Sequence, residues 1–385
     1  MNAFEFATDD RIIFGAESAA RIPDMARGLG TRAFLVLDQF SEPAAGVVDA
    51  LAEQELLAAT YHVYGEPSTD SVAEGVDLAR QAECDVVIAV GGGSVIDTGK
   101  AVAALVANGG QPLDYLEVVG LGKSLAKPSL PLVAAPTTAG TGAEVTKNAV
   151  LKVPDKAVKV SLRSAYMLPT VAVVDPLLTL TMPPHVTAST GLDALTQCLE
   201  PYVSCQSNPL TDAIAVAGLH RAARSLRKAY EDGDDVEART DMALTSLFGG
   251  LALANAKLGA VHGFAGVLGG MYPAPHGIVC ARLLPFVVET NVRALESRDP
   301  HSPLLSRFGE VAKIVTGDEA ATVAQGVDWI QELCGALGVP GLAEFGVVEA
   351  DFPEIVSKSQ PASSMRGNPL PLTDEELTAI LHQAL

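Results

Sequence analysis

The stretch Gly91-Gly92-Gly93-Ser94-Val95-Ile96-Asp97-Thr98-Gly99-Lys100 decides the fold of the N-terminal half of this chain. It follows the apolar run 85–90 and leads into the alanine-rich run 101–105. A dinucleotide phosphate site needs this order of strand, glycine turn and helix. Glycines let backbone N–H groups approach an anion, and the helix directs the positive end of its dipole at the same point. The alternative is a tight connection that binds nothing.

A second turn of this kind follows the apolar run 131–135. It reads Pro136-Thr137-Thr138-Ala139-Gly140-Thr141-Gly142-Ala143-Glu144 and is rich in hydroxyls and glycines. The recurrence of the pattern favours ligand binding over a tight connection that binds nothing. We therefore predict that the two turns hold one cofactor.

Short apolar runs alternate with helical stretches through the first half of the chain, and this predicts a mostly parallel, doubly wound sheet. The expected strands are 33–37, 60–64, 85–90, 131–135 and 171–174. After residue 180 the sequence becomes rich in alanine and leucine, which predicts helices. The expected helices are 188–203, 210–230, 236–258, 321–337 and 374–385, the last capped by Thr373, with a loop at 357–371. We expect two domains, 1–180 and 181–385.

Composition limits the kinds of partner. The net charge of −20 repels phosphate backbones and anionic lipid, so we expect a small-molecule substrate, with neither a nucleic-acid nor a membrane partner. The five cysteines are odd in number and scattered, which favours free thiols in a reducing compartment. No apolar run reaches membrane-spanning length, and the acidic N-terminal residues are not those of a signal peptide. We expect a cytoplasmic protein.

Two acidic residues stand where they can act near a cofactor. Asp38 ends the strand 33–37, where a carboxylate can accept hydrogen bonds from a ribose and repel a 2′-phosphate, so it predicts NAD preference. An ordinary turn aspartate is the alternative. Asp97 and Lys100 are three residues apart at a helix start, which favours a local ion pair over contact with a ligand.

The helical half carries a candidate metal site. Asp193 and Gln197 are four residues apart on one helix face, and His262 and His276 lie in apolar, glycine-rich surroundings. One carboxylate and two imidazoles suit zinc or ferrous iron and leave a position open for a substrate oxygen. The alternative for each histidine is a hydrogen-bonded residue of the core.

These motifs together resemble the iron-containing, or group III, alcohol dehydrogenase family, which includes a glycerol dehydrogenase-like branch. The resemblance covers nearly the whole chain. It rests, in order, on Ile13-Phe14-Gly15, on the two glycine turns, on Asp175-Pro176, on Thr190-Gly191-Leu192-Asp193-Ala194-Leu195-Thr196, and on His276-Gly277 with Leu283-Leu284-Pro285. It implies an α/β N-terminal Rossmann-like domain that binds NAD, an all-α C-terminal domain, the dehydroquinate synthase-like architecture, and an active site between the domains.

The resemblance also implies roles for single residues. Asp193, His262 and His276 match catalytic metal ligands, and Gln197 stands at the fourth ligand position. Residues that match cofactor contacts are Asp38, Gly92, Gly93, Ser94, Thr137, Thr138, Thr141, Asn148, Lys159 and Leu178.

Two departures from the family pattern stand out. The family's Asp-Ala-Leu-Thr-His ends here in Gln197, a poorer donor to iron or zinc than imidazole. The family's His-x-x-x-His begins here at His262 and ends at Gly266, so an imidazole near the nicotinamide is missing. Three ligands can suffice, since glycerol dehydrogenases hold zinc with Asp-His-His. Otherwise Gln197 fills the space and the site holds no metal.

The function implied is reversible hydride transfer between a small alcohol and NAD, with the substrate oxygen on a divalent metal that acts as a Lewis acid. A metal-independent reductase of an activated carbonyl or oxo acid, as maleylacetate reductases are thought to be, is a first alternative. A catalytically decayed NAD-binding subunit is a second. Family members are commonly dimers, so we expect a homodimer.

Overall fold

The computed structural model describes residues 3–39, 42–156 and 158–385. These residues form two compact units. One comprises Ala7–Thr138 and Gly142–Met182; the other comprises Pro183–Leu385 with Ala139–Thr141 and the described part of Met1–Phe6. The first is an α/β unit and the second is helical, so the predicted fold class is confirmed.

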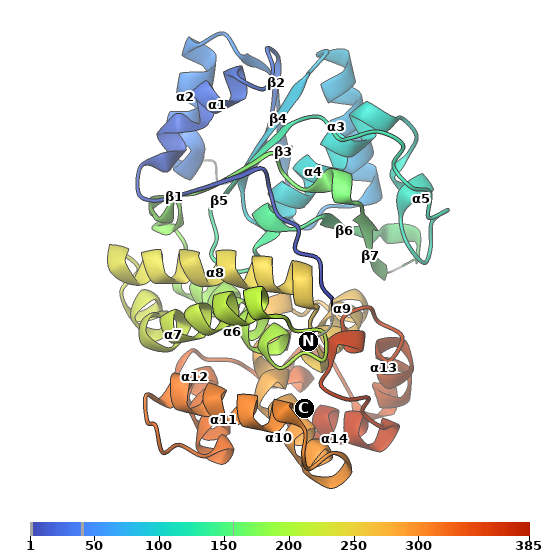
Figure 1. Ribbon diagram of the computed structural model, residues 1–385. Coiled ribbons are helices and arrows are strands. Elements are labelled where there is room, and N and C mark those ends of the chain that lie inside the picture. The colour runs from blue at the N-terminus through green and yellow to red at the C-terminus, as the bar shows by residue number, and fades with distance from the viewer. Residues whose placement is uncertain (1–2, 40–41, 157) are drawn as a thin grey trace. The chain divides into compact units, whose positions relative to one another are not determined.

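The α/β unit is built on a six-stranded parallel sheet with the order β1-β8-β5-β4-β2-β3 (Figure 1). All five predicted strands are present. The strands are β1 Arg11–Phe14, β2 Ala33–Asp38, β3 Leu57–Val63, β4 Val86–Gly91, β5 Leu132–Pro136 and β8 Val171–Val174. The sequence did not predict β1, which has only four residues and no fully buried side chain.

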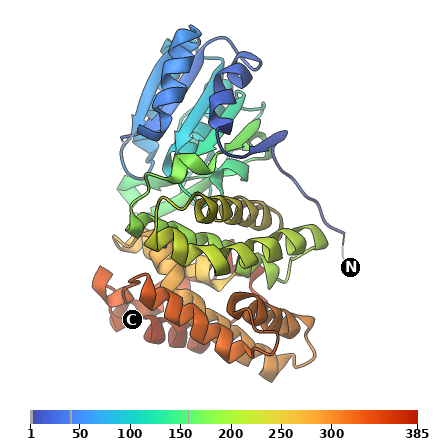
Figure 2. The same cartoon turned by 90° about the vertical axis from the view of Figure 1, so that its left-hand side faces the viewer.

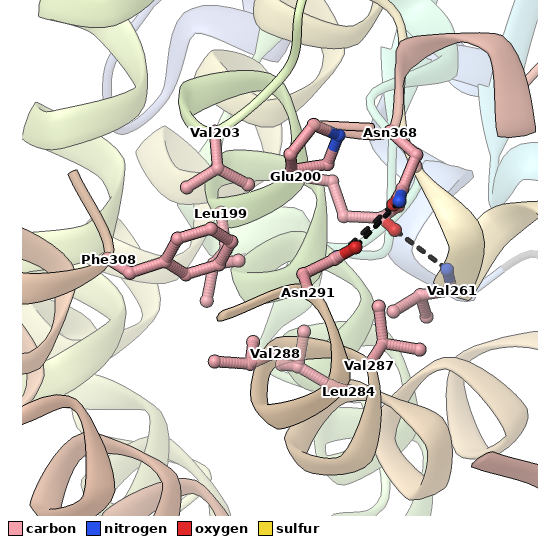
Figure 3. Close-up of a pocket in the computed structure, with 12 residues that line it drawn as sticks. Leu199, Glu200, Val203, Val261, Leu284, Val287, Val288, Asn291, Phe308 and Asn368 are labelled. Atoms are coloured by element: carbon pink, nitrogen blue, oxygen red, sulfur yellow. Dashed lines mark hydrogen bonds between the residues drawn. The ribbon is translucent and has the colours of Figure 1, made fainter. Parts of the chain in front are cut away.

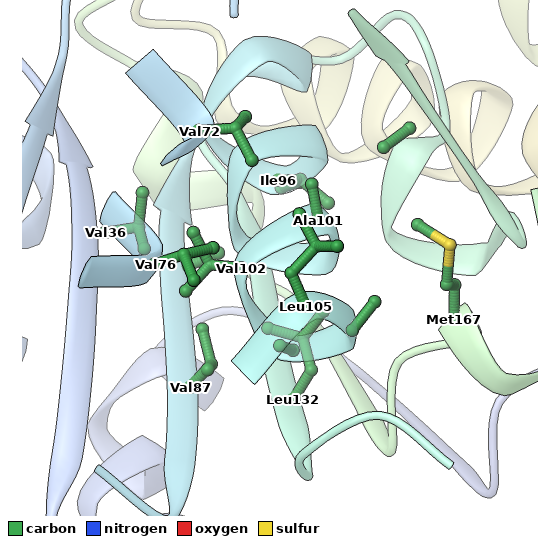
Figure 4. Close-up of a cluster of buried hydrophobic side chains, with 14 of the residues drawn as sticks. Val36, Val72, Val76, Val87, Ile96, Ala101, Val102, Leu105, Leu132 and Met167 are labelled. Carbon is green, nitrogen blue, oxygen red and sulfur yellow. The ribbon is translucent and has the colours of Figure 1, made fainter. Parts of the chain in front are cut away.

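Both faces of the sheet are buried, because successive side chains of a strand point to opposite sides. Phe34 and Val36 of β2 join the core under α3 Thr69–Gln81 and α4 Gly93–Asn108 (Figure 4). Leu35 and Leu37 join the core under α1 Ile22–Arg27 and α2 Ala45–Glu53. This explains why the strands read as continuous apolar runs.

The α/β unit also contains an antiparallel hairpin formed by β6 Asn148–Val153 and β7 Val158–Arg163. A short helix, α5 Pro112–Tyr115, belongs to the same unit. The sequence did not predict the hairpin. Residues of β6 alternate between buried and exposed, which gives a weaker signal than the apolar runs of the main sheet.

The helical unit contains α6 to α14 (Figure 2). The predicted helices correspond to α6 Pro184–Tyr202, α7 Pro209–Glu231, α8 Val236–Ala256, α12 Val323–Ala336 and α14 Asp374–Ala384. The predicted cap is confirmed, since the Thr373 hydroxyl accepts from the Glu376 N–H. The helices not predicted are α9 Ala260–Met271, α10 His276–Arg298, α11 Pro303–Thr316 and α13 Phe352–Ser359.

Local features of α9 and α10 hid these two helices from sequence inspection. Four glycines lower the helix propensity of α9, and Pro285 interrupts the pattern of α10. Both helices form because their residues are buried in tertiary contacts, which override local propensity. The predicted loop 357–371 is correct only after Ser359, since α13 covers its first three residues and a single turn forms at Met365–Gly367.

Two further expectations from the sequence concern membrane-spanning segments and the oxidation state of the cysteines. Among the described residues, no single helix has the length and apolarity to cross a membrane, although the sharply bent pair α8 and α9 would meet both criteria jointly. All five cysteines are free thiols, and only Cys205 is exposed.

Candidate active site

The carboxyl edge of the sheet offers the α/β unit's candidate ligand site. β2 and β4 are neighbours, yet the helices that follow them, α2 and α4, pack on opposite faces. Such a topological switch point leaves a crevice beyond the carboxyl ends of the two strands. Asp38 is the last residue of β2 and Gly91 the last of β4, so the switch point joins the predicted carboxylate to the glycine turn.

The glycine turn leaves the start of α4 open. A Cβ on Gly91 would lie 2.5 Å from the Val95 side chain, so packing within the protein requires that glycine. A Cβ on Gly92 would meet nothing closer than Thr138, at 3.5 Å, so internal packing does not require glycine there. No side chain caps α4, and the first N–H groups of a helix have no partner within it. These N–H groups suit an anion.

The structure brings the second turn beside the first. Pro136 is in register with Gly91, and the Thr137 N–H donates to the Gly91 carbonyl at 3.0 Å. Thr138 follows, next to Gly92. Gly92, Thr137 and Thr138 therefore form one cluster, with Asp38 on the adjacent strand.

Other predicted cofactor residues lie farther along the chain. Leu178 is buried in the turn after β8, and Asn148 begins β6. Lys159 of β7 is paired with Glu66. Thr141 is exposed and lies in the Ala139–Thr141 segment, which belongs to the helical unit.

The predicted local ion pair is confirmed. Lys100 Nζ lies 3.6 Å from Asp97 Oδ1 and is fully buried. It also donates to the Thr146 hydroxyl at 2.9 Å and to the Asn148 carbonyl at 3.0 Å. Burial lowers the pKa of Lys100 and raises the pKa of Asp97. The pair ties α4 to the β6 hairpin.

In the helical unit four side chains converge. The ligand atoms of Asp193, His262, His276 and Cys280 all lie within 4.8 Å of one another. Asp193 Oδ1 is 3.3 Å from His262 Nε2 and 3.9 Å from His276 Nε2. Cys280 Sγ is 3.8 Å from His262 Nε2 and 3.7 Å from His276 Nε2. The structure thus brings the predicted trio together and adds a thiol.

Three helices present these residues. Asp193 lies on α6, His262 on α9, and both His276 and Cys280 on the first turns of α10. Gly277 lets α10 begin against the backbone of α6, because a Cβ there would lie 2.0 Å from the Ser189 carbonyl oxygen. The Pro-His-Gly sequence therefore sets how close His276 comes to Asp193.

Glu200 fixes the orientation of His262. Its Oε2 lies 2.7 Å from His262 Nδ1, and its Oε1 accepts from the Val261 N–H at 2.8 Å. When the imidazole is neutral and Nδ1 donates to the carboxylate, the Nε2 lone pair is free to bind a cation on the side of Asp193 Oδ1. Carboxylate partners of this kind orient metal-ligating histidines.

Gln197 is buried and contacts the Asp193 carboxylate. Its Nε2 donates to Asp193 Oδ2 at 2.8 Å. Within the described part of the chain, Asp193 Oδ1 and Gln197 Oε1 are buried without a hydrogen-bond partner. A buried carboxylate oxygen left in this way, facing two imidazoles, fits a bound cation.

The charges of the cluster shift its pKa values. Burial acts to raise the pKa of Asp193, but His262, His276 and Gln197 outweigh it and lower the pKa below its ordinary value. Burial acts to lower the pKa of His262, but Cys280, Asp193 and Glu200 outweigh it and raise the pKa well above 6.5. Cys280 and Asp193 also raise the pKa of His276. These pKa shifts favour an ionised carboxylate beside protonated imidazoles, so a bound cation would take the place of the imidazole Nε2 protons.

Sequence reasoning missed Glu200 and Cys280. Glu200 follows Asp193 by seven residues, and Cys280 follows His276 by four, so each shares a helix face with a predicted ligand. That spacing was the available signal, but α10 itself was not predicted.

A small cavity is lined by Glu200 and Val261 together with residues of α10 (Figure 3). Asn291 and Asn368 hydrogen-bond to each other in its wall, among apolar side chains. Its volume of about 10 Å³ suits at most one water, so it is not a substrate pocket.

The comparisons with known proteins agree with this geometry. The family model "iron-containing alcohol dehydrogenase" matches residues 9–176, and the model of the C-terminal part of that family matches residues 187–385. The chain therefore belongs to the iron-containing alcohol dehydrogenase family. Like its family, it is an oxidoreductase of the alcohol dehydrogenase class.

Individual relatives cover most of the chain. Alcohol dehydrogenase 4 of Schizosaccharomyces pombe is 37% identical over 88% of this chain and 78% of its own length. The crystal structure of a 1,3-propanediol oxidoreductase covers all of both chains with a TM-score of 0.91 and 32% identity. Sulfoacetaldehyde reductase from Bifidobacterium kashiwanohense, solved in complex with NAD⁺, has a TM-score of 0.88 at 28% identity over 100% of this chain and 99% of its own.

Proposed function

We propose that this enzyme transfers a hydride between a small alcohol and NAD, with a divalent metal held by Asp193, His262 and His276. The observation that carries the proposal is the convergence of Asp193 Oδ1, otherwise unpartnered among the described residues, with the two imidazole Nε2 atoms. When bound, the metal supplies Lewis-acid polarisation of the substrate oxygen. The protein's part is to hold, orient and shield the reacting groups.

The carboxyl edge of the α/β unit supports NAD as the hydride carrier. The N–H groups at the start of α4 would hold the pyrophosphate through Gly92, Gly93 and Ser94, together with Thr137 and Thr138 of the neighbouring turn. The Asp38 carboxylate accepts from the adenosine ribose and repels a 2′-phosphate, so NAD is preferred over NADP. Thr141, Asn148, Lys159 and Leu178 remain proposed contacts toward the nicotinamide end.

In the helical unit each residue has a separate task. Glu200 keeps the proton of His262 on Nδ1, which leaves Nε2 free for the cation. Gln197 holds Asp193 by its Oδ2 and keeps Oδ1 turned to the imidazoles. His276, whose side chain is 41% exposed, forms the accessible side of the site.

The substrate proton leaves without an imidazole at position 266. A Cβ added to Gly266 would meet nothing within 4 Å, so the space beside it is open to water. We propose that water and hydroxyl groups carry the proton there. A missing general base of this kind costs roughly 10²-fold in rate when nothing replaces it.

The first test is metal content and metal dependence. Protein purified without added metal should contain close to one equivalent of zinc or iron by elemental analysis. NADH-dependent aldehyde reduction should fall on chelation and return when zinc or iron is added. Metal-free protein with turnover that chelators do not affect would instead establish a metal-independent reductase of activated carbonyls.

Asp193→Asn tests the assignment of the carboxylate. The amide keeps the shape but removes the negative charge that the cation needs, so we expect loss of turnover and of bound metal. NADH binding, measured by fluorescence titration, should be unchanged. An active variant that still binds metal at full occupancy would contradict the assignment.

We also propose a homodimer. Light scattering of the purified protein would measure its mass directly.

A further inference from the structure

The Cys280 side chain lies in the same cluster as the proposed metal ligands. It is fully buried, one helical turn after His276, and its Sγ faces both imidazole Nε2 atoms at 3.8 and 3.7 Å. A buried thiol in an apolar core is ordinary. A buried thiol beside two imidazoles and a carboxylate oxygen that lacks a hydrogen-bond partner in the described residues belongs to a set of metal-binding donors.

Gln197 is the weaker of two candidates for a fourth donor, because only its amide oxygen, buried without a hydrogen-bond partner among the described residues, remains to bind a metal. Its amide nitrogen is committed to Asp193 Oδ2, and an amide oxygen is a weaker donor to zinc or ferrous iron than imidazole or thiolate. The imidazole that the family has at position 197 is therefore replaced on α6 by a weaker donor. The cluster contains another donor, on α10.

The sulfur–nitrogen and oxygen–nitrogen distances are close to those of a tetrahedral centre. With metal–nitrogen bonds of about 2.1 Å and a metal–sulfur bond of about 2.3 Å, tetrahedral angles separate sulfur from nitrogen by about 3.6 Å. The two sulfur–nitrogen distances are 3.8 and 3.7 Å. The carboxylate oxygen lies at 3.3 and 3.9 Å from the nitrogens, against roughly 3.4 Å for such a centre.

We propose that Cys280 Sγ is the fourth metal ligand of this enzyme and takes the place of the histidine that the family has where this chain has Gln197. The inference rests on the proposed metal site formed by Asp193, His262 and His276. On binding, the Cys280 thiol loses its proton to solvent and its sulfur bonds to the cation as a thiolate.

This ligand set has a consequence for the choice of metal. Thiolate is a soft donor and favours zinc over ferrous iron. A ligand set made only of nitrogen and oxygen atoms lacks this preference for zinc. Zinc can also expand from four to five ligands during reaction, so four protein ligands still allow a substrate oxygen. We therefore expect zinc in the purified enzyme.

Cobalt(II) tests the sulfur ligand directly, because a thiolate–cobalt bond produces a charge-transfer absorption in the near ultraviolet. Metal-free full-length enzyme, Cys280→Ser and the matched control Cys334→Ser should be titrated with cobalt(II). Cys334 is also a buried thiol, and its nearest hydrogen-bond partner is the Ala281 carbonyl. We expect the absorption in wild type and Cys334→Ser and its loss in Cys280→Ser, with zinc affinity of that variant more than about 10-fold lower.

The remaining outcomes separate the two proposals. Visible cobalt bands in wild type without the charge-transfer absorption would overturn the role of Cys280 and leave the three-ligand site standing. Absence of cobalt binding in wild type would overturn both. If Cys280→Ser does not fold, X-ray absorption of zinc-loaded wild type decides, because one sulfur neighbour at about 2.3 Å is expected and a shell of only nitrogen and oxygen contradicts it.

Discussion

At the scale of single residues, the carboxylate of Glu200 determines what His262 can bind. Glu200 is buried, accepts from a backbone N–H with one oxygen and faces His262 Nδ1 with the other. The proton on Nδ1 therefore makes Nε2 the donor atom. The role of the histidine depends on a residue 62 positions away in the sequence.

Glu200→Gln should weaken metal binding without changing the size of the side chain. The amide oxygen can still accept from Val261, but its NH₂ group then faces His262 Nδ1. The imidazole proton moves to Nε2, where it competes with the cation. We expect a 10–100-fold loss of zinc affinity in chelator competition.

A matched control for this variant is Glu231→Gln, at an exposed site at the end of α7. It should bind zinc like wild type. Equal affinity in Glu200→Gln and Glu231→Gln would show that Glu200 does not orient the ligand.

Asp9 is a second residue whose environment determines its charge. It is buried, and among the described residues neither of its carboxylate oxygens has a hydrogen-bond partner. Burial raises its pKa to about 9; Lys100 acts to lower it, and Glu144 acts to raise it. The folded protein therefore keeps the Asp9 proton over a pH range in which the unfolded chain has lost it.

Asp9→Asn should stabilise the protein, and increasingly so as the pH rises. Between about pH 4 and pH 9 the folded state of wild type binds more protons than the unfolded state at this site, so wild-type stability falls with rising pH. Asparagine does not titrate. We expect a gain of more than about 1 kcal/mol at pH 8 and much less at pH 5, measured by thermal unfolding. A gain independent of pH would contradict the raised pKa.

At the scale of elements, two glycines in successive helices have opposite requirements. Gly277 at the start of α10 touches the α6 backbone, whereas Gly266 in α9 has open space where a side chain would be. Close packing against α6 requires glycine at position 277. At position 266 the effect of a substitution depends on helix propensity alone.

Gly277→Ala and Gly266→Ala form a matched pair. The Gly277 variant must move α10 away from Ser189, so we expect it to lose about 1–3 kcal/mol and to bind metal more weakly. The Gly266 variant should gain up to about 1 kcal/mol, because alanine replaces glycine inside a helix at no steric cost. Urea unfolding measures both. A stable Gly277→Ala with normal metal affinity would show that α10 does not depend on this close contact.

At the scale of the whole molecule, the proposed metal and NAD sites lie in different compact units. The ligands Asp193, His262 and His276 all belong to the helical unit, and Asp38, Gly92 and Thr137 all belong to the α/β unit. The net charge of −20 opposes an anionic cofactor overall, so in the proposed NAD site the local N–H donors at the start of α4 would have to attract the pyrophosphate.

Hydrogen exchange should therefore report the two ligands in different places. Adding zinc to the chelated enzyme should slow exchange in α6, α9 and α10, and NADH should slow it in the turns after β2, β4 and β5. At 100 times its dissociation constant each ligand adds about 2.7 kcal/mol of stability. Protection by NADH confined to α6, α9 and α10 would contradict the proposed dinucleotide site.

The sequence predicted the parts of the fold that have a local signal. Apolar runs that alternate with helical stretches marked five strands of the parallel sheet, and Thr373 marked the start of α14. Weak local signals concealed the β6–β7 hairpin, the glycine-rich α9 and the proline-containing α10. Their formation depends on burial against other elements, which no local pattern records.

The candidate site divides in the same way. The sequence by itself predicted Asp193, His262 and His276 as a metal-binding set and placed Gln197 on the same helix face as Asp193, because residue type and helical spacing carry that information. Only the tertiary structure decided that Gln197 holds Asp193, that Glu200 orients His262 and that Cys280 joins the cluster. The physical reason is that these contacts form where α6, α9 and α10 pack together, through backbone approaches as close as that of Gly277 to Ser189.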